Sequence, residues 1–154
     1  MNQQEYAGFW IRTGAAMLDS LLIFIITLPL ISVIYGEAYW TSESLIRGFW
    51  DAVINYVLPA FAVIVFWVYK SATPGKMLTQ LTIVDAKTGQ KPSTTQFMVR
   101  YLSYFIAAIP LLIGIMWVGI DKRKQGWHDK IAGTVVLRSR FNKPVKFEET
   151  DVHH

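Results

Sequence analysis

The sequence predicts an all-α transmembrane protein, with three hydrophobic units and a short cytoplasmic β-hairpin in a single domain spanning residues 1–154. Three observations support this prediction. Hydrophobic residues make up 53% of the 154 residues and charged residues only 17%. Three apolar runs approach the roughly 20 residues that a helix needs to cross about 30 Å of hydrocarbon. One carboxylate, Asp19, stands as the only charge inside the first run.

The first two runs are predicted to cross the membrane as helices. Residues 13–35 are longer than the apolar core of a signal peptide and lack a basic segment before them, so we expect them to stay as an anchor. Residues 52–69 hold no charge and are bounded by Asp51 and Lys70. The two runs therefore predict a helical hairpin.

The third run, residues 97–120, is interrupted by Arg100 and Pro110. As one helix its 24 residues would measure about 36 Å, enough for a single crossing. A proline inside a helix breaks the hydrogen-bond ladder, and irregular backbone is tolerated in a membrane where protein shields it. We favour a broken or re-entrant unit at Pro110, with the single crossing as the alternative.

Charge is distributed unevenly between the connections. The loop at 36–51 is mainly acidic, whereas the loop at 70–96 and the segment at 121–146 are mainly basic. Basic loops stay in the cytoplasm, so we expect a cell (inner) membrane protein with a cytoplasmic N-terminus and, for a re-entrant third unit, a cytoplasmic C-terminus. The same basic surface is predicted to attract anionic lipids of the bilayer.

Two short segments have the composition of strands. Residues 78–86 are rich in β-formers and precede the turn-like sequence 87–90, which indicates a hairpin. Residues 134–137 form a second candidate strand. The two could pair only if both lie on the same side of the membrane, which would support the re-entrant arrangement.

Asp19 is the first candidate functional residue, because a carboxylate in a membrane helix is costly and often marks an ion or proton path. Arg12 lies seven residues earlier on the same helix face, and we expect its long side chain to reach outward to the lipid phosphates. If Phe9 marks the interface, Asp19 lies about 15 Å deeper, near the midplane. Candidate neighbours on the other helices are Asn55, Arg100 and Tyr104, with Arg100 as the counter-charge.

Other classes of function are disfavoured. The chain has no cysteine, no nucleic-acid motif and no catalytic spacing, so we expect neither an enzyme nor a cofactor. His128 and Asp129 provide two metal ligands where zinc usually needs three or four, so no metal site is predicted. We expect Asp129 instead to cap or orient residues 127–132 and to pair with Lys130, Lys122 or Arg123.

Four motifs resemble the RDD family in the same order: GFWIRTGAAMLDSLL, TPGKMLTQLTIVDAKTG, the arginine of MVRYL, and RKQGWHDKIAGTVVL. The family is named for one arginine and two aspartates, which match Arg12, Asp19 and Asp129. The resemblance implies a small bacterial integral membrane protein, for which transport of an unidentified ligand, including cation/proton exchange, is proposed. The residues at 125–127 depart mildly from the pattern, because an arginine or threonine is common there.

Two functions follow, from different classes. In the first, Asp19 alternates between a proton and a monovalent cation as in an antiporter. Arg12 and Arg100 hold the helix arrangement or adjust the proton affinity of Asp19, and Asp129 receives or releases ions at the cytoplasmic mouth. Because three short units enclose little volume, this function predicts a homo-oligomer. In the second, the chain is a structural or accessory membrane module, whose arginine and aspartate network only fixes helix packing.

Overall fold

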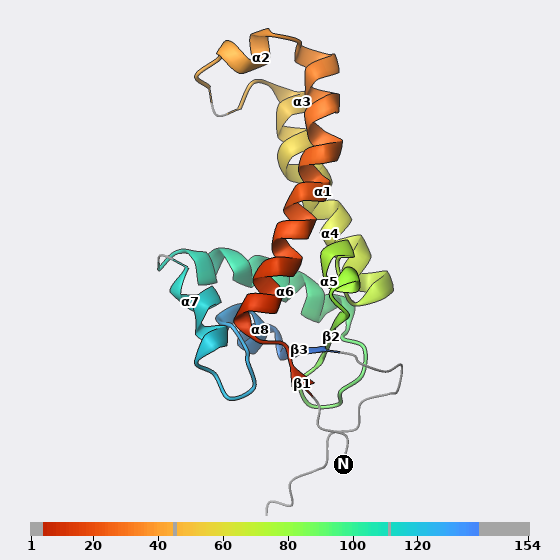
Figure 1. Cartoon of the computed structure of the whole chain (residues 1–154), viewed down its shortest axis with the longest axis vertical. Coiled ribbons are helices and arrows are strands. Elements are labelled where there is room, and N and C mark those ends of the chain that lie inside the picture. The colour runs from red at the N-terminus through yellow and green to blue at the C-terminus, as the bar shows by residue number, and fades with distance from the viewer. Residues whose placement is uncertain (1–4, 45, 111, 139–154) are drawn as a thin grey trace, which may run out of the picture.

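The fold is a long helical hairpin that rises from a base of short helices and a small sheet (Figure 1). The computed structural model describes residues 5–44, 46–110 and 112–138. The first arm is α1 (Phe9–Tyr35), and the second runs through α3 (Phe49–Ala52), a π-helical turn (Val53–Val57) and α4 (Leu58–Lys70). Both arms are long and apolar enough to cross a membrane, which confirms the two predicted spans.

Local sequence explains where α1 ends and why the second arm contains a π-helical turn. Gly36 ends α1 with a φ of 60°, a conformation that glycine adopts without strain. The π-helical turn ends two residues before Pro59, whose ring would clash with the Asn55 carbonyl in a regular helix. The short helix α2 (Ala38–Thr41) lies between the arms at the end remote from the base.

The third hydrophobic unit is broken. Helix α6 (Thr94–Ala108) begins with a capping box in which Ser93 and Gln96 exchange hydrogen bonds. After Pro110 the chain continues as α7 (Ile113–Met116) and a 3₁₀ turn (Trp117–Gly119), bent by 116° from α6. The predicted break at Pro110 is therefore confirmed.

A three-stranded antiparallel sheet connects three distant parts of the chain. The central strand β3 (Thr134–Arg138) pairs with β1 (Glu5–Tyr6) on one side and with β2 (Leu81–Asp85) on the other. Both predicted strands are present and pair with each other, and β1 joins them. Because one sheet cannot form across a bilayer, the chain before α1, the loop after α4 and β3 lie on the same side.

The base has its own hydrophobic core beside this sheet. Ile83 and Val136 from the strands pack with Phe97 of α6, Trp67 of α4 and Ala15 of α1. Two short helices, α5 (Pro74–Leu78) and α8 (Trp127–Ala132), complete the base. The lower parts of both arms are therefore held by the base.

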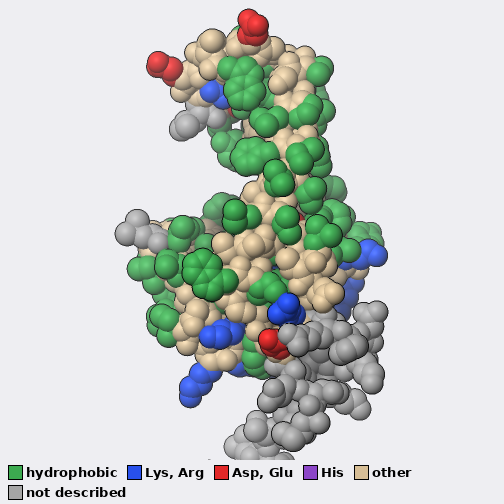
Figure 2. Space-filling model, viewed as in Figure 1, with side chains coloured by type: hydrophobic (Ala, Val, Ile, Leu, Met, Phe, Trp, Pro, Cys, Tyr) green, Lys and Arg blue, Asp and Glu red, His purple; other side chains and the backbone are tan. Residues whose placement is uncertain are grey.

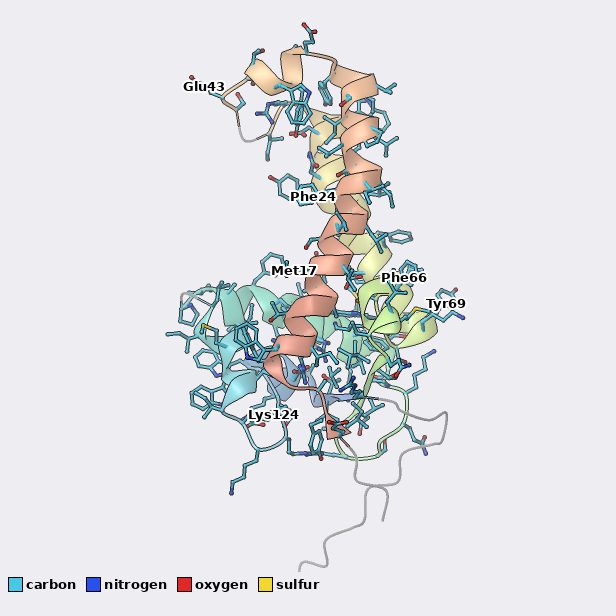
Figure 3. The ribbon with its side chains drawn as sticks, viewed as in Figure 1. Met17, Phe24, Glu43, Phe66, Tyr69 and Lys124 are labelled. Atoms are coloured by element: carbon cyan, nitrogen blue, oxygen red, sulfur yellow. The ribbon has the colours of Figure 1, made fainter. Side chains whose placement is uncertain are left out.

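The hairpin surface is apolar, and the ends are charged. Figure 2 shows hydrophobic side chains along the arms and most of the visible Lys and Arg side chains around the base. Met17, Phe24 and Phe66 point away from the hairpin axis (Figure 3), with exposed fractions of 68%, 59% and 38%. Such exposure of large apolar side chains is expected for a surface that lies in lipid.

Candidate functional site

A buried ion network lies in the base, and we call it the Asp129 cluster: Arg12, Arg100, His128, Asp129 and Thr134. Arg12 Nη1 lies 2.5 Å from Asp129 Oδ2, and Arg100 Nη1 lies 2.5 Å from Asp129 Oδ1. Arg100 Nη1 also donates to Thr134 Oγ1 over 2.7 Å. The Arg100 and Asp129 side chains are completely buried. One carboxylate therefore holds two arginines from helices that are distant in sequence.

Thr134 of this network begins strand β3, and the other members lie at the start or on the inner face of a helix. Arg12 lies in the first turn of α1 and also donates to the carbonyl oxygens of Ala7 and Lys124, over 2.9 Å and 2.6 Å. Asp129 lies in the first turn of α8, where the Gly126 N–H donates to Oδ2 over 3.1 Å. The network thus ties the beginning of α1 to α6 and α8.

The electrostatics of the Asp129 cluster favour a fixed charge state. Burial would raise the pKa of Asp129, but Arg100 and Arg12 hold it well below its usual range. Burial lowers the pKa of His128 to about 3, and the nearby arginines act in the same direction. The His128 ring stacks on Tyr104 with centroids 4.0 Å apart. At neutral pH Asp129 is therefore ionised and His128 neutral.

Asp19 has a different environment from the Asp129 cluster. Its carboxylate accepts hydrogen bonds from Thr73 Oγ1 over 2.5 Å and from the Gly75 N–H over 2.7 Å. Among residues 5–44, 46–110 and 112–138 it forms no ion pair. Gly75 makes this contact feasible, because an added Cβ would meet the Ala15 carbonyl oxygen and lie 2.9 Å from Asp19 Cγ. Asp19 is thus held by neutral donors.

Beside Asp19 is an open cleft of about 300 Å³ between α1, α4 and α6, which we call the Asp19 cleft. Its walls are mostly apolar and aromatic, and Asp19 is its single charged residue. The lining residues are Ala16, Asp19, Ser20, Ile23, Val63, Trp67, Thr73, Tyr101, Tyr104 and Phe105. The cleft gives Asp19 access from outside the helix bundle.

The structure brings together only part of the predicted neighbourhood of Asp19. Tyr104 does line the same cleft. Arg100 is not the counter-charge of Asp19, because its guanidinium turns toward the base and pairs with Asp129. Asn55 is wrongly placed too, since its side chain donates to Asp51 and Tyr39 near the remote end of the hairpin.

Two expectations about the charged residues of the base also need correction. Arg12 does not reach outward to lipid, because Asp129 and two carbonyl oxygens bind it inside the base. Asp129 does cap α8, as predicted, but its ion-pair partners are Arg12 and Arg100. Lys130 pairs instead with Asp121, over 2.5 Å.

Sequence reasoning missed the groups that surround Asp19. Thr73 and Gly75 belong to a Thr-Pro-Gly sequence, which is typical of a helix start and could have indicated free N–H donors there. Lys76 was also missed: it is buried, its Nζ lies 5.4 Å from the centroid of the Trp67 ring, and burial lowers its pKa. In the part of the chain that the structure describes, no group of three His, Asp or Glu residues could hold a metal ion.

Comparison with known proteins gives one family and several uncharacterised relatives. The RDD family model matches residues 6–133. Uncharacterized protein YckC of Bacillus subtilis is 29% identical over 88% of this chain and 87% of its own length. Uncharacterized membrane protein YteJ of the same organism is 29% identical over 88% of this chain and 83% of its own.

A third relative matches a shorter stretch. Uncharacterized protein RP437 of Rickettsia prowazekii is 43% identical over 49% of this chain, and the match spans 42% of that relative's length. No solved structure matches the chain.

Proposed function

The chain belongs to the RDD family of small membrane proteins, and from that premise we propose that it binds a cation at Asp19 and exchanges it for a proton. One observation supports Asp19 over the other family residues. Arg12 and Asp129 are engaged with each other inside the base, whereas Asp19 lines an open cleft. In this proposal Asp19 contacts the ligand, and the Asp129 cluster holds the helices in place.

The bonding of Asp19 suits reversible occupation. No described cation neutralises its carboxylate, while Thr73 and Gly75 hold it in one position. A proton and a cation would compete for the same oxygens, which is the minimum chemistry of an exchanger. Tyr104 lines the same cleft, and Arg100 acts through the Asp129 cluster as a positioning residue.

Assembly and orientation are part of this proposal. Two crossing arms enclose no path of their own, and the Asp19 cleft is open on one side, so exchange would require a homo-oligomer. We place the base in the cytoplasm of a bacterial cell, because Lys and Arg side chains gather there (Figure 2). The same basic surface would contact anionic lipids. The proposed role involves no enzymatic catalysis.

Flux measurements test the exchange. Protein in proteoliposomes with a trapped pH dye and an imposed sodium or potassium gradient should move protons, and Asp19→Asn should abolish this movement. Glu37→Gln is the matched control, because it removes an exposed carboxylate on the remote loop and should leave flux unchanged. Absence of wild-type flux with either cation would overturn the proposal.

The accessory module remains the second candidate, and the Asp129 cluster favours it. Two arginines on one buried carboxylate specify how α1, α6 and α8 pack, whatever happens at Asp19. For such a module, Asp19→Asn would reduce accumulation or assembly of the protein, because the contact with Thr73 and Gly75 would weaken. A folded Asp19→Asn variant that loses only flux would argue against this role.

A further inference from the structure

The Asp19 cleft is larger and less polar than a site for a bare metal cation needs to be. Its volume of about 300 Å³ lies at the lower end of sites for small organic molecules. Hard cations prefer several oxygen ligands at short distance. Asp19, Ser20, Thr73 and two tyrosines carry side-chain oxygens, but most of the surface of the cleft is apolar or aromatic.

The aromatic walls suit a cation of another kind. Trp67, Tyr101, Tyr104 and Phe105 come from two different helices and face one space. Aromatic faces attract substituted ammonium groups, most strongly where water is excluded. Asp19 contributes the one negative charge of this lining, and Thr73 and Gly75 hold that charge in place.

The positive charges nearby do not occupy the cleft. Arg100 pairs with Asp129, and both Arg100 and Lys76 lie over the Trp67 ring, each 5.4 Å from its centroid. Arg100 also lies 6.0 Å from the centroid of the Tyr104 ring, but neither cation lines the cleft. The carboxylate of Asp19 therefore faces the cleft without a cationic partner among the described residues. An amphiphilic cation would place its charge at Asp19 and its apolar substituents against the rings and the membrane.

We infer that the Asp19 cleft binds an organic cation, a substituted ammonium with apolar or aromatic groups, an inference that rests on the proposed cation binding at Asp19. The ammonium pairs with the Asp19 carboxylate. Its substituents contact Tyr104 and Phe105, which line the cleft and are less buried than Trp67. Because the cleft opens between helices whose other surfaces lie in lipid, the cation enters from the membrane.

Binding of benzyltrimethylammonium to the full chain in nanodiscs tests the inference, measured by calorimetry and by tryptophan fluorescence. We expect saturable binding of one molecule per chain, weakened about tenfold or more in Asp19→Asn. Neopentylbenzene, a neutral molecule of the same shape, should bind no tighter to the wild type than to Asp19→Asn. Equal binding of benzyltrimethylammonium to both proteins would overturn the inference.

A steric variant keeps the test valid if Asp19→Asn disturbs the fold. Ser20→Trp places a large ring in the cleft and leaves Asp19 intact, so it should also weaken binding about tenfold. Met17→Trp adds the same ring on the neighbouring exposed surface and should bind like the wild type. Equal affinities for both tryptophan variants would place the ligand elsewhere and contradict the inference.

Two further arms identify the source of the ammonium group and separate the two proposals. Ethanolamine lipids are added to phosphatidylglycerol nanodiscs that contain the protein. If these lipids compete with the probe, the ligand is a lipid headgroup, and if they do not, the ligand is a free amine. Both results support the site. Asp19-dependent sodium or potassium flux without probe binding would overturn this inference and leave the exchange standing. Asp19-dependent binding of the probe without flux would overturn the exchange and leave the binding of an organic cation standing.

Discussion

Asp129 and Asp19 are the same residue type in two different surroundings. Asp129 has no exposed surface and contacts two arginines, so its removal would leave buried positive charges without a partner. Asp19 is partly exposed, accepts hydrogen bonds from a hydroxyl and an N–H, and lines a cleft. We therefore expect Asp129 to stabilise the fold, and these surroundings support the proposed ligand contact at Asp19.

The buried His128 predicts a loss of stability in mild acid. In the unfolded chain His128 takes up its proton near its ordinary pKa of 6.5, but in the folded protein only near about 3. The unfolded state therefore binds more protons between these values, and the free energy of unfolding should fall as the pH falls through this window. The slope should reach at most about 1.4 kcal/mol per pH unit.

Thermal unfolding of the detergent-solubilised protein between pH 7 and about 4 measures this slope. His128→Phe keeps a ring that can stack on Tyr104 but cannot bind a proton, so its melting temperature should change less over the same range. Parallel curves for the two proteins would contradict the assignment. The lowered pKa of Asp129 adds a loss at still lower pH, below its ordinary value of 3.8.

Close packing of α5 against α1 joins the loop after α4 to the first arm. Gly75 lies so near the Ala15 backbone and the Asp19 side chain that no larger residue fits without movement. This contact also brings the Gly75 N–H to the carboxylate. The position of Asp19 therefore depends on a glycine in another element.

Gly75→Ala should push α5 away from α1. Overpacking of this kind costs about 1 to 3 kcal/mol, and the lost hydrogen bonds to Asp19 should weaken any ligand binding there. Gly14→Ala is the matched control, because its Cβ meets nothing within 4 Å and alanine favours a helix. Melting temperatures of the two variants in detergent measure the difference; equal values would show that α5 can shift freely.

The sheet determines which described segments lie on the same side of a bilayer. Strands from before α1, after α4 and after α8 pair with one another, so the unit formed by α6 and α7 starts and ends on the side of the base. A single crossing by residues 97–120 would place β3 on the other side from β2.

Cysteine labelling tests this topology, because the chain has no native cysteine. Thr88→Cys in the loop after β2 and Lys122→Cys after the 3₁₀ turn should react with a membrane-impermeant maleimide only once the cells are permeabilised. Glu37→Cys on the remote loop should react in intact cells. Opposite labelling of Thr88→Cys and Lys122→Cys would contradict a re-entrant third unit.

Much of this architecture could be predicted from local composition. A run of apolar residues specifies a membrane helix wherever it folds, because lipid requires every backbone group to be bonded within the segment. Pro110 predicts a break because proline interrupts the hydrogen-bond ladder of a helix. The β-formers at 78–86 and 134–137 predict strands, and the structure has strands at 81–85 and 134–138. The exceptional character of Asp19 follows from its apolar neighbours in the sequence alone.

The partners of the charged residues could not be predicted in this way. Arg12 is seven residues from Asp19 but bonds to Asp129, 117 positions away, because the sheet and α8 close over the start of α1. Arg100 turns to the same carboxylate, which leaves Asp19 to Thr73 and Gly75. Helical spacing states which side chains share a face, whereas the choice of partner depends on contacts between segments distant in the chain.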